Sequence, residues 1–243
     1  MVVGVYGLGR FGSFWAAQLA TRYEVRAYSR RPHPAPTGVE QAAEDEVLQS
    51  DVIVLCVAIS AMEEVVGQIA GRVRPGALVM DTCSIKVHPV EVMARLLPEE
   101  VAILGTHPMF GPDSARDGVA GQPMIVTPVR ASAELVGFWQ TEFRDMGLRV
   151  IELSADDHDR EAAATQGVTH LVGRVLSELR LEPSQIGTVG YKKLLEVVEQ
   201  TCNDSHQLFV DLQRFNPHTV EMRRRVEAAL AVVTEPLDGQ TPG

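Results

Sequence analysis

The sequence has few features that would cross-link the chain, anchor it in a membrane or attract a nucleic acid. Its 243 residues include three scattered cysteines and no C-x-x-C pair, so we expect reduced thiols rather than disulfides. No apolar run approaches the ~18 residues that a membrane span requires, and no signal peptide precedes the first apolar segment. The formal net charge of -10, without a basic stripe, argues against a nucleic-acid partner. A cytoplasmic protein without membrane or nucleic-acid partners is the expectation.

The sequence does contain, at its start, a strand–turn–helix pattern with a glycine fingerprint. Val2–Tyr6 is a β-branched apolar run typical of a buried strand, and it leads directly into G-x-G-x-x-G. In such a motif Gly7 permits the tight turn, Gly9 lets the backbone approach a pyrophosphate, and Gly12 lets the helix lie close to the strand. The N–H groups at the helix N-terminus then favour phosphate. A lone motif of this kind is weak, but its place between a strand and a helix predicts a dinucleotide site.

The second predicted strand, Glu24–Tyr28, is followed by a hydroxyl and two arginines. NAD sites usually have a carboxylate here, which binds the ribose hydroxyls. Arginines instead suit a 2′-phosphate through charge-assisted hydrogen bonds, although a solvated basic turn is the structural alternative. We therefore predict NADP as the preferred cofactor, with NAD possible. The residues expected to bind it are Gly7, Leu8, Gly9, Arg10, Phe11, Gly12, Ser29, Arg30, Arg31, Val57 and Ala58.

Strand and helix patterns alternate up to Leu153 and are replaced by helical patterns alone after it. The further predicted strands are 51–57, 77–80, 101–104, 124–127 and 149–152, and the predicted helices are 13–21, 61–72, 89–97, 131–146, 162–181, 186–202, 204–215 and 217–233. Some of the later helices are apolar on more than one face, which suggests packing against a second subunit. The pattern predicts an α/β fold in which an N-terminal Rossmann-like doubly wound sheet (1–153) precedes an all-α C-terminal dimerisation domain (154–243). The last ten or so residues are expected to form a frayed tail.

A histidine is expected at the carboxyl edge of this sheet. His107 follows a predicted strand as part of a loop, and Pro108 favours an extended backbone that would direct the imidazole into a cleft. An imidazole can accept the proton of a hydroxyl as it is oxidised, but His107 could equally pack beside Phe110. Ser84, after the neighbouring strand, could hydrogen-bond the same imidazole or hydroxyl. Lys86 could pair with a substrate carboxylate or a phosphate; a helix cap and a surface cation are the structural alternatives.

A second polar group is predicted in the helical region. Gln166 and His170 are four residues apart and therefore share a helix face, and His158 lies in the same helical stretch. Among alanines and apolar residues they indicate a wet pocket, or else core groups that satisfy each other. No cysteine or carboxylate completes a zinc-ligand spacing, and no G-x-S-x-G elbow is present, so neither a metal site nor a serine hydrolase is predicted.

Over nearly its whole length the chain resembles the prephenate/arogenate dehydrogenases of tyrosine biosynthesis. The histidine segment and the Q-x-x-T-H helix are the specific part of this resemblance. The segments that carry it are the glycine fingerprint, Asp81 with Ser84-Ile85-Lys86, 105–112, 157–160, 166–170, 208–213 and Asn216-Pro217.

The resemblance implies a homodimeric oxidoreductase that decarboxylates prephenate or arogenate oxidatively and transfers hydride to NADP or NAD. The product would be 4-hydroxyphenylpyruvate or tyrosine. It further implies that His107 takes the proton of the ring hydroxyl at C4, with Ser84 orienting it. Lys86, Gln166 and His170 would contact the substrate. Retention of His107 favours a hydroxylated substrate over an amino analogue.

Two positions depart from the family pattern. Gln200 stands where the family usually has an arginine that binds a substrate carboxylate, and Ala58 stands where proline is frequent. An amide bonds a carboxylate more weakly than a bidentate guanidinium does. The cations that could substitute are Arg174, Lys192, Lys193 and Arg214.

Two alternatives therefore stay open. One is another NADP-dependent dehydrogenase or reductase of the same layout, although such enzymes normally carry a catalytic lysine or aspartate where this helix has Gln166 and His170. The other is a catalytically impaired nucleotide-binding regulatory protein.

Overall fold

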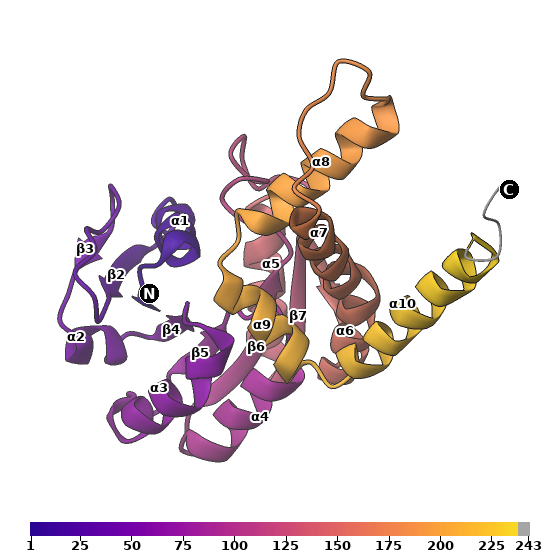
Figure 1. Cartoon of the computed structure of the whole chain (residues 1–243). Helices are drawn as coiled ribbons and strands as arrows, with labels where there is room; N and C mark the ends of the chain where they lie inside the picture. The colour runs from indigo at the N-terminus through magenta and orange to yellow at the C-terminus, as the bar shows by residue number, and fades with distance from the viewer. Residues whose placement is uncertain (238–243) are drawn as a thin grey trace, which may run out of the picture. The chain divides into compact units, whose positions relative to one another are not determined.

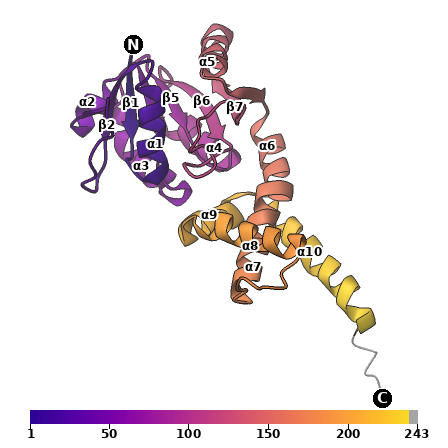
Figure 2. The same cartoon turned by 90° about the horizontal axis from the view of Figure 1, so that it is seen from above.

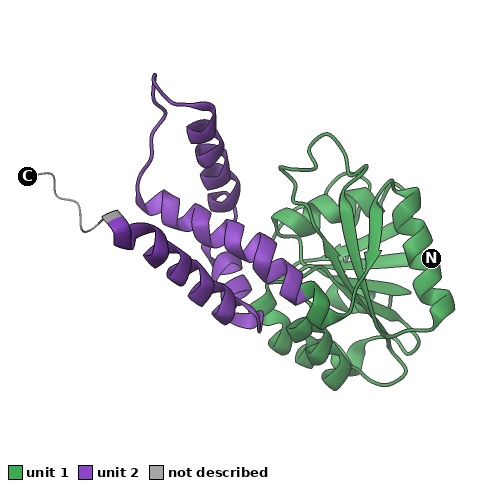
Figure 3. Ribbon diagram, turned by 90° about the vertical axis from the view of Figure 1, so that its right-hand side faces the viewer, with its two compact units in different colours: residues 1–158 green, residues 159–243 purple. Residues whose placement is uncertain are grey.

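The computed structural model describes residues 1–237 and divides the chain into two compact units, Met1–His158 and Asp159–Gly243 (Figure 3). The division falls inside helix α6 (Ala155–Ala162), whereas the sequence analysis placed the domain boundary just before this helix. Residues 238–243 of the predicted tail lie outside the described residues. Among residues 1–237 no helix has both the length and the apolar character that crossing a membrane requires.

The N-terminal unit is built on one eight-stranded sheet (Figure 1). Its strands are β1 (Val2–Tyr6), β2 (Glu24–Tyr28), β3 (Glu40–Gln41), β4 (Val52–Leu55), β5 (Leu78–Asp81), β6 (Ala102–Pro108), β7 (Pro123–Arg130) and β8 (Arg149–Glu152). They lie in the order β3-β2-β1-β4-β5-β6-β7-β8, and only the β6–β7 pair is antiparallel. The first six strands follow the 3-2-1-4-5-6 order of the doubly wound dinucleotide-binding fold, which confirms the predicted fold class.

Helices lie on both faces of this sheet (Figure 2). They are α1 (Arg10–Leu19), α2 (Glu44–Leu48), α3 (Met62–Ile69), α4 (Val87–Leu96) and α5 (Ala133–Asp145), with short 3₁₀ turns at Ile59–Ala61 and Ala70–Arg72. Because side chains alternate along a strand, Val52 and Val54 share a core with Trp15 of α1 and Trp139 of α5. Ile53 and Leu55 are equally buried and point to the opposite face. A strand buried on both sides explains why β4 is apolar at every position.

The largest correction to the predicted fold concerns His107. The sequence predicted a loop at this residue, but β6 continues to Pro108. It does so because β7 runs antiparallel beside it, pairing His107 with Ile125 and Pro108 with Met124. The predicted strand ended at Leu104, and glycine and proline, which are uncommon inside strands, occupy positions 105 and 108 of its continuation. The short elements β3 and α2 were not predicted either.

The C-terminal unit is helical, as predicted. After α6 the chain continues through a π-helical turn, η3 (Ala163–Gly167), into α7 (Val168–Glu178), α8 (Val189–Cys202), α9 (His206–Phe215), α10 (Thr219–Thr234) and a 3₁₀ turn (Glu235–Leu237). Helices α7 and α8 pack at a close crossing, where a Cβ built on Gly173 would lie 2.1 Å from Oγ1 of Thr201. Within the described residues the buried apolar side chains of this unit are Ala162, Ala163, Leu212 and Met222.

Candidate active site

The glycine turn between β1 and α1 has the geometry that a pyrophosphate site requires. Gly7 has φ +109°, which an L side chain rarely adopts, and a Cβ on Gly12 would lie 1.9 Å from the carbonyl oxygen of Gly7. A Cβ on Gly9, in contrast, would meet nothing within 4 Å. Only Gly9, the N-cap of α1, therefore faces open space. Internal constraints therefore account for Gly7 and Gly12, whereas the backbone at Gly9 is open. An open backbone at this position could accommodate the phosphates of a dinucleotide.

The other predicted cofactor residues lie near the carboxyl ends of adjacent strands. Ser29, Arg30 and Arg31 follow β2, and Val57 and Ala58 follow β4, while β1 lies between these two strands. Parallel strands bring their carboxyl ends to one edge, so the fingerprint, the basic turn and Val57–Ala58 share that edge.

Three arginine and aromatic side chains around this edge differ in their contacts. Arg30 is exposed, and its Nη1 lies 3.5 Å from Oε1 of Glu64. Arg10 forms an exposed ion pair with Asp113. Phe11 is half-buried and its ring stacks on Trp15. Both arginine pairs are solvent-exposed, so they hold their cations weakly.

A buried ion pair lies between β5 and β6. Lys86 and Asp81 are fully buried and bonded to each other, and the Lys86 Nζ also donates to the carbonyl oxygen of Thr106 over 2.7 Å. The other Asp81 oxygen accepts the backbone N–H of Thr106 at 3.1 Å. The ammonium expected to contact substrate is thus occupied by the protein itself. Together with Asp81 it holds the backbone of Thr106, the residue immediately before His107, in place.

His107 itself is bonded to another histidine. It is 2% exposed, and its Nδ1 lies 2.9 Å from Nε2 of His158, which is also 2% exposed. Burial lowers the pKa of His107 well below its ordinary value, and the neighbouring His158 and the Lys86 cation add to this effect. The imidazole is therefore neutral near pH 7 and able to accept a proton. Its Nε2 has no hydrogen-bond partner among residues 1–237.

Ser84 is half-buried in the connection between β5 and α4, and its side chain forms no hydrogen bond with the described residues. The partner that orients His107 here is His158, to which the sequence analysis assigned no role. Nothing in the spacing could have linked them, because His158 lies fifty-one positions later in α6 and the contact arises only from the fold. An orienting bond from Ser84 stays a prediction.

The predicted polar face of the second unit extends by one residue. Gln166, His170 and Arg174 succeed one another at four-residue intervals, beginning in the π-helical turn, a feature that is frequent at functional sites. Each has a sealed polar atom without a hydrogen-bond partner among the described residues, namely Oε1, Nδ1 and Nε respectively. Buried polar atoms are rarely left unbonded, so this row is suited to a ligand.

Asp204 adds a carboxylate to this row. Its Oδ2 lies 3.8 Å from Nε2 of His170, and its backbone carbonyl accepts a hydrogen bond of 2.8 Å from Arg174. Burial lowers the pKa of His170, and Arg174 lowers it further while Asp204 opposes the shift. Gln200 is exposed on α8. Arg174 is the one of the four candidate cations that lies in this row.

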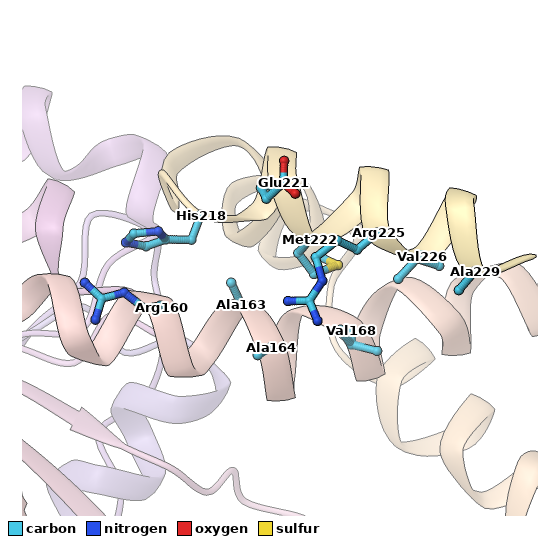
Figure 4. Close-up of a pocket in the computed structure, with 10 residues that line it drawn as sticks. All are labelled: Arg160, Ala163, Ala164, Val168, His218, Glu221, Met222, Arg225, Val226 and Ala229. Atoms are coloured by element: carbon cyan, nitrogen blue, oxygen red, sulfur yellow. The ribbon is translucent and has the colours of Figure 1, made fainter.

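A cavity of about 400 Å³ also occurs in the second unit, between the α6–α7 segment and α10 (Figure 4). Its lining combines apolar side chains such as Met222 and Val226 with Arg160, His218 and Arg225. None of the site residues expected from the sequence lines it. Among the described residues, no cluster of three or more His, Cys, Asp or Glu side chains could hold a metal ion.

Comparison with known proteins gives consistent results for both units. Residues 29–168 match the family described as prephenate dehydrogenase, nucleotide-binding domain, and residues 175–242 match the TYRAAT1-like C-terminal domain. The chain is 33% identical to arogenate dehydrogenase 2, chloroplastic, of Arabidopsis thaliana, over 98% of this chain and 70% of that protein. It is also 33% identical to arogenate dehydrogenase 1, chloroplastic, of the same plant, again over 98% of this chain, but it spans only 39% of that protein's length.

The solved structures show the same fold. The crystal structure of prephenate dehydrogenase from A. aeolicus, in complex with hydroxyphenyl propionate and NAD+, aligns with a TM-score of 0.77 at 16% identity. The alignment covers 98% of this chain and 90% of that one. The N-terminal unit thus contains the family's nucleotide-binding domain and has the fold of the solved prephenate dehydrogenase.

Proposed function

Because this chain belongs to the prephenate dehydrogenase family, we propose that it is an NADP-preferring dehydrogenase that decarboxylates arogenate or prephenate oxidatively. The observation that carries the proposal is a buried, neutral imidazole, His107, at the carboxyl end of the sheet in a domain with an intact dinucleotide turn. A proton acceptor beside a dinucleotide is what alcohol oxidation needs.

The cofactor assignment rests on the β1–α1 turn and on the basic turn after β2. Gly9 leaves the backbone open to a pyrophosphate, and the N-terminus of α1 has no acidic side chain in its first turn that would repel it. When bound, the nicotinamide supplies the hydride acceptor. Arg30 and Arg31, without a carboxylate at the end of β2, favour a cofactor with a 2′-phosphate.

In this proposal the side chains of the site accept a proton and position the substrate. The Nε2 of His107 would accept the proton of the substrate's ring hydroxyl. At the same time, hydride would leave the carbon that bears this hydroxyl, and the ring carboxylate would depart as CO₂. Because the product ring is aromatic, the reaction is strongly downhill, and orientation of the partners with a base is sufficient. Ser84, in the neighbouring connection, is the proposed second contact to the hydroxyl. The burial of Lys86 favours a role in holding Thr106 beside His107 over direct contact with substrate.

Gln166 and His170 are proposed as substrate contacts, since each has a buried polar atom without a partner. The carboxylate of Asp204, 3.8 Å from His170, favours a substrate that carries an ammonium group. Arogenate has one where prephenate has a keto oxygen, and two of the relatives are arogenate dehydrogenases. We therefore place arogenate ahead of prephenate.

The assembly and location belong to the same proposal. Exposed apolar side chains on the second unit's helices support a homodimer formed through these helices. The cytoplasm stays the proposed location, although the plant relatives are named chloroplastic.

The test is a spectrophotometric assay of nicotinamide reduction with arogenate and with prephenate, each with NADP and with NAD. We expect turnover with both substrates, a higher kcat/KM for arogenate, and a higher kcat/KM with NADP. Absence of reduction in all four mixtures would reject the proposed activity. Tight dinucleotide binding without any turnover would instead support the regulatory alternative.

A further inference from the structure

The contact between His107 and His158 joins two imidazoles that are almost completely shielded from solvent. Their Nδ1 and Nε2 atoms are 2.9 Å apart, and the ring planes are inclined by 69° with centroids 5.1 Å apart. His107 is held by strand β6 and His158 by helix α6. Two ordered elements therefore hold the pair at hydrogen-bonding distance.

A hydrogen bond between two neutral imidazoles needs one donor and one acceptor. A base that takes a proton on Nε2 must already carry its own proton on Nδ1, since a neutral ring has only one N–H. For His107 the Nδ1–H then donates to His158, whose Nε2 must be the unprotonated atom. The proposed chemistry at one nitrogen thus fixes the tautomers of both rings.

We propose that His107 and His158 act together as a two-histidine proton acceptor in the dehydrogenase reaction. His158 keeps His107 in the Nδ1–H tautomer and receives that proton as His107 takes the proton of the substrate hydroxyl. This inference rests on the proposed function. His158 acts through His107 and is therefore a positioning and relay residue.

The step balances without another reactant. The substrate O–H bond breaks and a new N–H bond forms at Nε2 of His107, while the Nδ1–H bond of His107 breaks and an N–H bond forms at Nε2 of His158. The hydride and CO₂ leave as described above, and the pair retains one proton, which returns to solvent after the product departs. The positive charge ends on the second ring instead of the first.

The pairing differs from the usual arrangement in which a carboxylate orients a catalytic histidine. A carboxylate holds the imidazolium but is not itself protonated. A second imidazole has a ring nitrogen that can itself take up the proton, so that the proton can pass from one ring to the other. Burial is the main effect that disfavours a charge on His107, and Lys86, which lies behind Thr106, adds to it; together they give such a transfer a physical reason.

The first experiment compares His158→Gln with His158→Phe in the full chain. The glutamine Oε1 can accept the Nδ1–H bond and preserve the tautomer, but it cannot take the proton, so we expect kcat to fall roughly 10-fold at unchanged KM. Phenylalanine removes both functions, and the expected loss is roughly 10²- to 10³-fold. His206→Gln, an exposed histidine in α9, is the matched control and should retain full activity.

A wild-type rate for His158→Phe would overturn the proposal as a whole. A wild-type rate for His158→Gln would overturn the proton transfer, because orientation alone would then account for the pair. NADP affinity is measured for each variant, so that a general loss of structure is recognised.

The second experiment needs no turnover. In ¹⁵N-histidine-labelled wild-type protein and in His158→Gln, long-range ¹H–¹⁵N correlation should show His107 as the Nδ1–H tautomer; an Nε2–H tautomer would overturn the inference. If the tautomer is as expected but no substrate is oxidised, the proposed function fails and the hydrogen-bond arrangement stands. If arogenate is oxidised and the tautomer is wrong, the function stands and the two-histidine acceptor fails.

Discussion

The two units of this chain differ in how far each completes its own interior. In the N-terminal unit, the apolar sides of β1, β2, β4 and β5 share one continuous core with α1 and α5. Its large exposed apolar side chains are Met1, Val129 and Phe138. In the described part of the C-terminal unit they are Val175, Leu179, Ile186, Val189, Leu194, Val220, Leu230, Val232 and Val233.

The difference teaches where each unit's stability comes from. Burial of apolar surface is the main favourable term in folding, at roughly 25 cal/mol per Å². The first unit obtains it internally, whereas the described part of the second unit has four buried apolar side chains, two of them alanines. Under the proposed homodimer, the exposed apolar side chains of the second unit would be buried against the partner subunit. Changes at the proposed site residues of the first unit should act on chemistry within one chain, and changes at the exposed apolar residues of the second unit on assembly.

The largest expected effect is a chemical one confined to the first unit. His107→Asn keeps a hydrogen-bonding side chain in β6 but removes the proton acceptor, so kcat should fall by roughly 10²- to 10⁴-fold. Steady-state assays with arogenate and NADP measure this loss. Dinucleotide affinity and molecular mass in solution should not change. A change in molecular mass would contradict the expectation that this substitution affects chemistry and not assembly.

The second prediction addresses assembly. Leu230 and Val233 are exposed, three residues apart on α10, and share a face. If α10 is covered in a dimer, the double change to glutamate would bury two charges and weaken association by about 100-fold or more. Sedimentation velocity should then give a monomer. Val129→Glu, at an equally apolar exposed position of β7, is the control and should leave the dimer intact; a monomeric wild type would refute the comparison itself.

A smaller effect is expected at the basic turn. Arg30→Ala removes a guanidinium that would contact the 2′-phosphate, so NADP affinity should fall roughly 10- to 100-fold, as for a lost charge-assisted hydrogen bond. NAD affinity should hardly change. Calorimetric titration with both dinucleotides checks this, with Arg95→Ala, a surface ion-pair residue on α4, as the control. Equal losses for NAD and NADP would contradict the phosphate-binding role.

Two of the three fingerprint glycines, Gly9 and Gly12, separate folding from binding inside the first unit. Gly12→Ala would force backbone apart, since its Cβ would lie 1.9 Å from a carbonyl oxygen, and should lower the free energy of unfolding by about 1–3 kcal/mol. Gly9→Ala meets nothing within 4 Å and should change that free energy by less than about 0.5 kcal/mol while weakening dinucleotide binding. Denaturant titration and dinucleotide titration of both variants measure the two effects. Equal stability losses would show that Gly9 is also a packing residue.

The predictability of these features from sequence follows the same division. Strand β1, strand β2 and the fingerprint were predictable because apolar runs, turn glycines and a helix start are local signals. The continuation of β6 through His107 was not, since it depends on pairing with β7, which lies about twenty residues later. The local sequence around Gly105 and Pro108 contains no signal that an antiparallel strand will pair with it.

Side-chain pairings were harder to predict than backbone elements. From its position His107 was one of two equal possibilities, a base or a packed histidine, whereas its partner His158 and the buried pair of Lys86 with Asp81 required the fold. Lysine and aspartate side chains usually lie at the protein surface. Only the folded sheet shows that Lys86 and Asp81 are buried. In the second unit, the four-residue spacing correctly suggested a polar face, whereas the proximity of Asp204 to His170 arises from helix packing.

The last prediction, which is graded with pH, compares the units through their buried histidines. Burial lowers the pKa of His107 in the first unit and of His170 in the second below the ordinary 6.5. Below pH 6.5 the unfolded chain therefore binds protons that the folded chain does not, and stability present above that pH is lost as the pH falls, by up to about 1.4 kcal/mol per pH unit for each histidine.

Thermal unfolding of the wild type and of two variants, measured between neutral and mildly acidic pH, tests this prediction. His107→Asn should flatten the pH dependence of the first unit's transition only, and His170→Asn that of the second. If either substitution flattens both transitions equally, the units unfold as one cooperative body. The contrast between the two units would then apply to packing but not to stability.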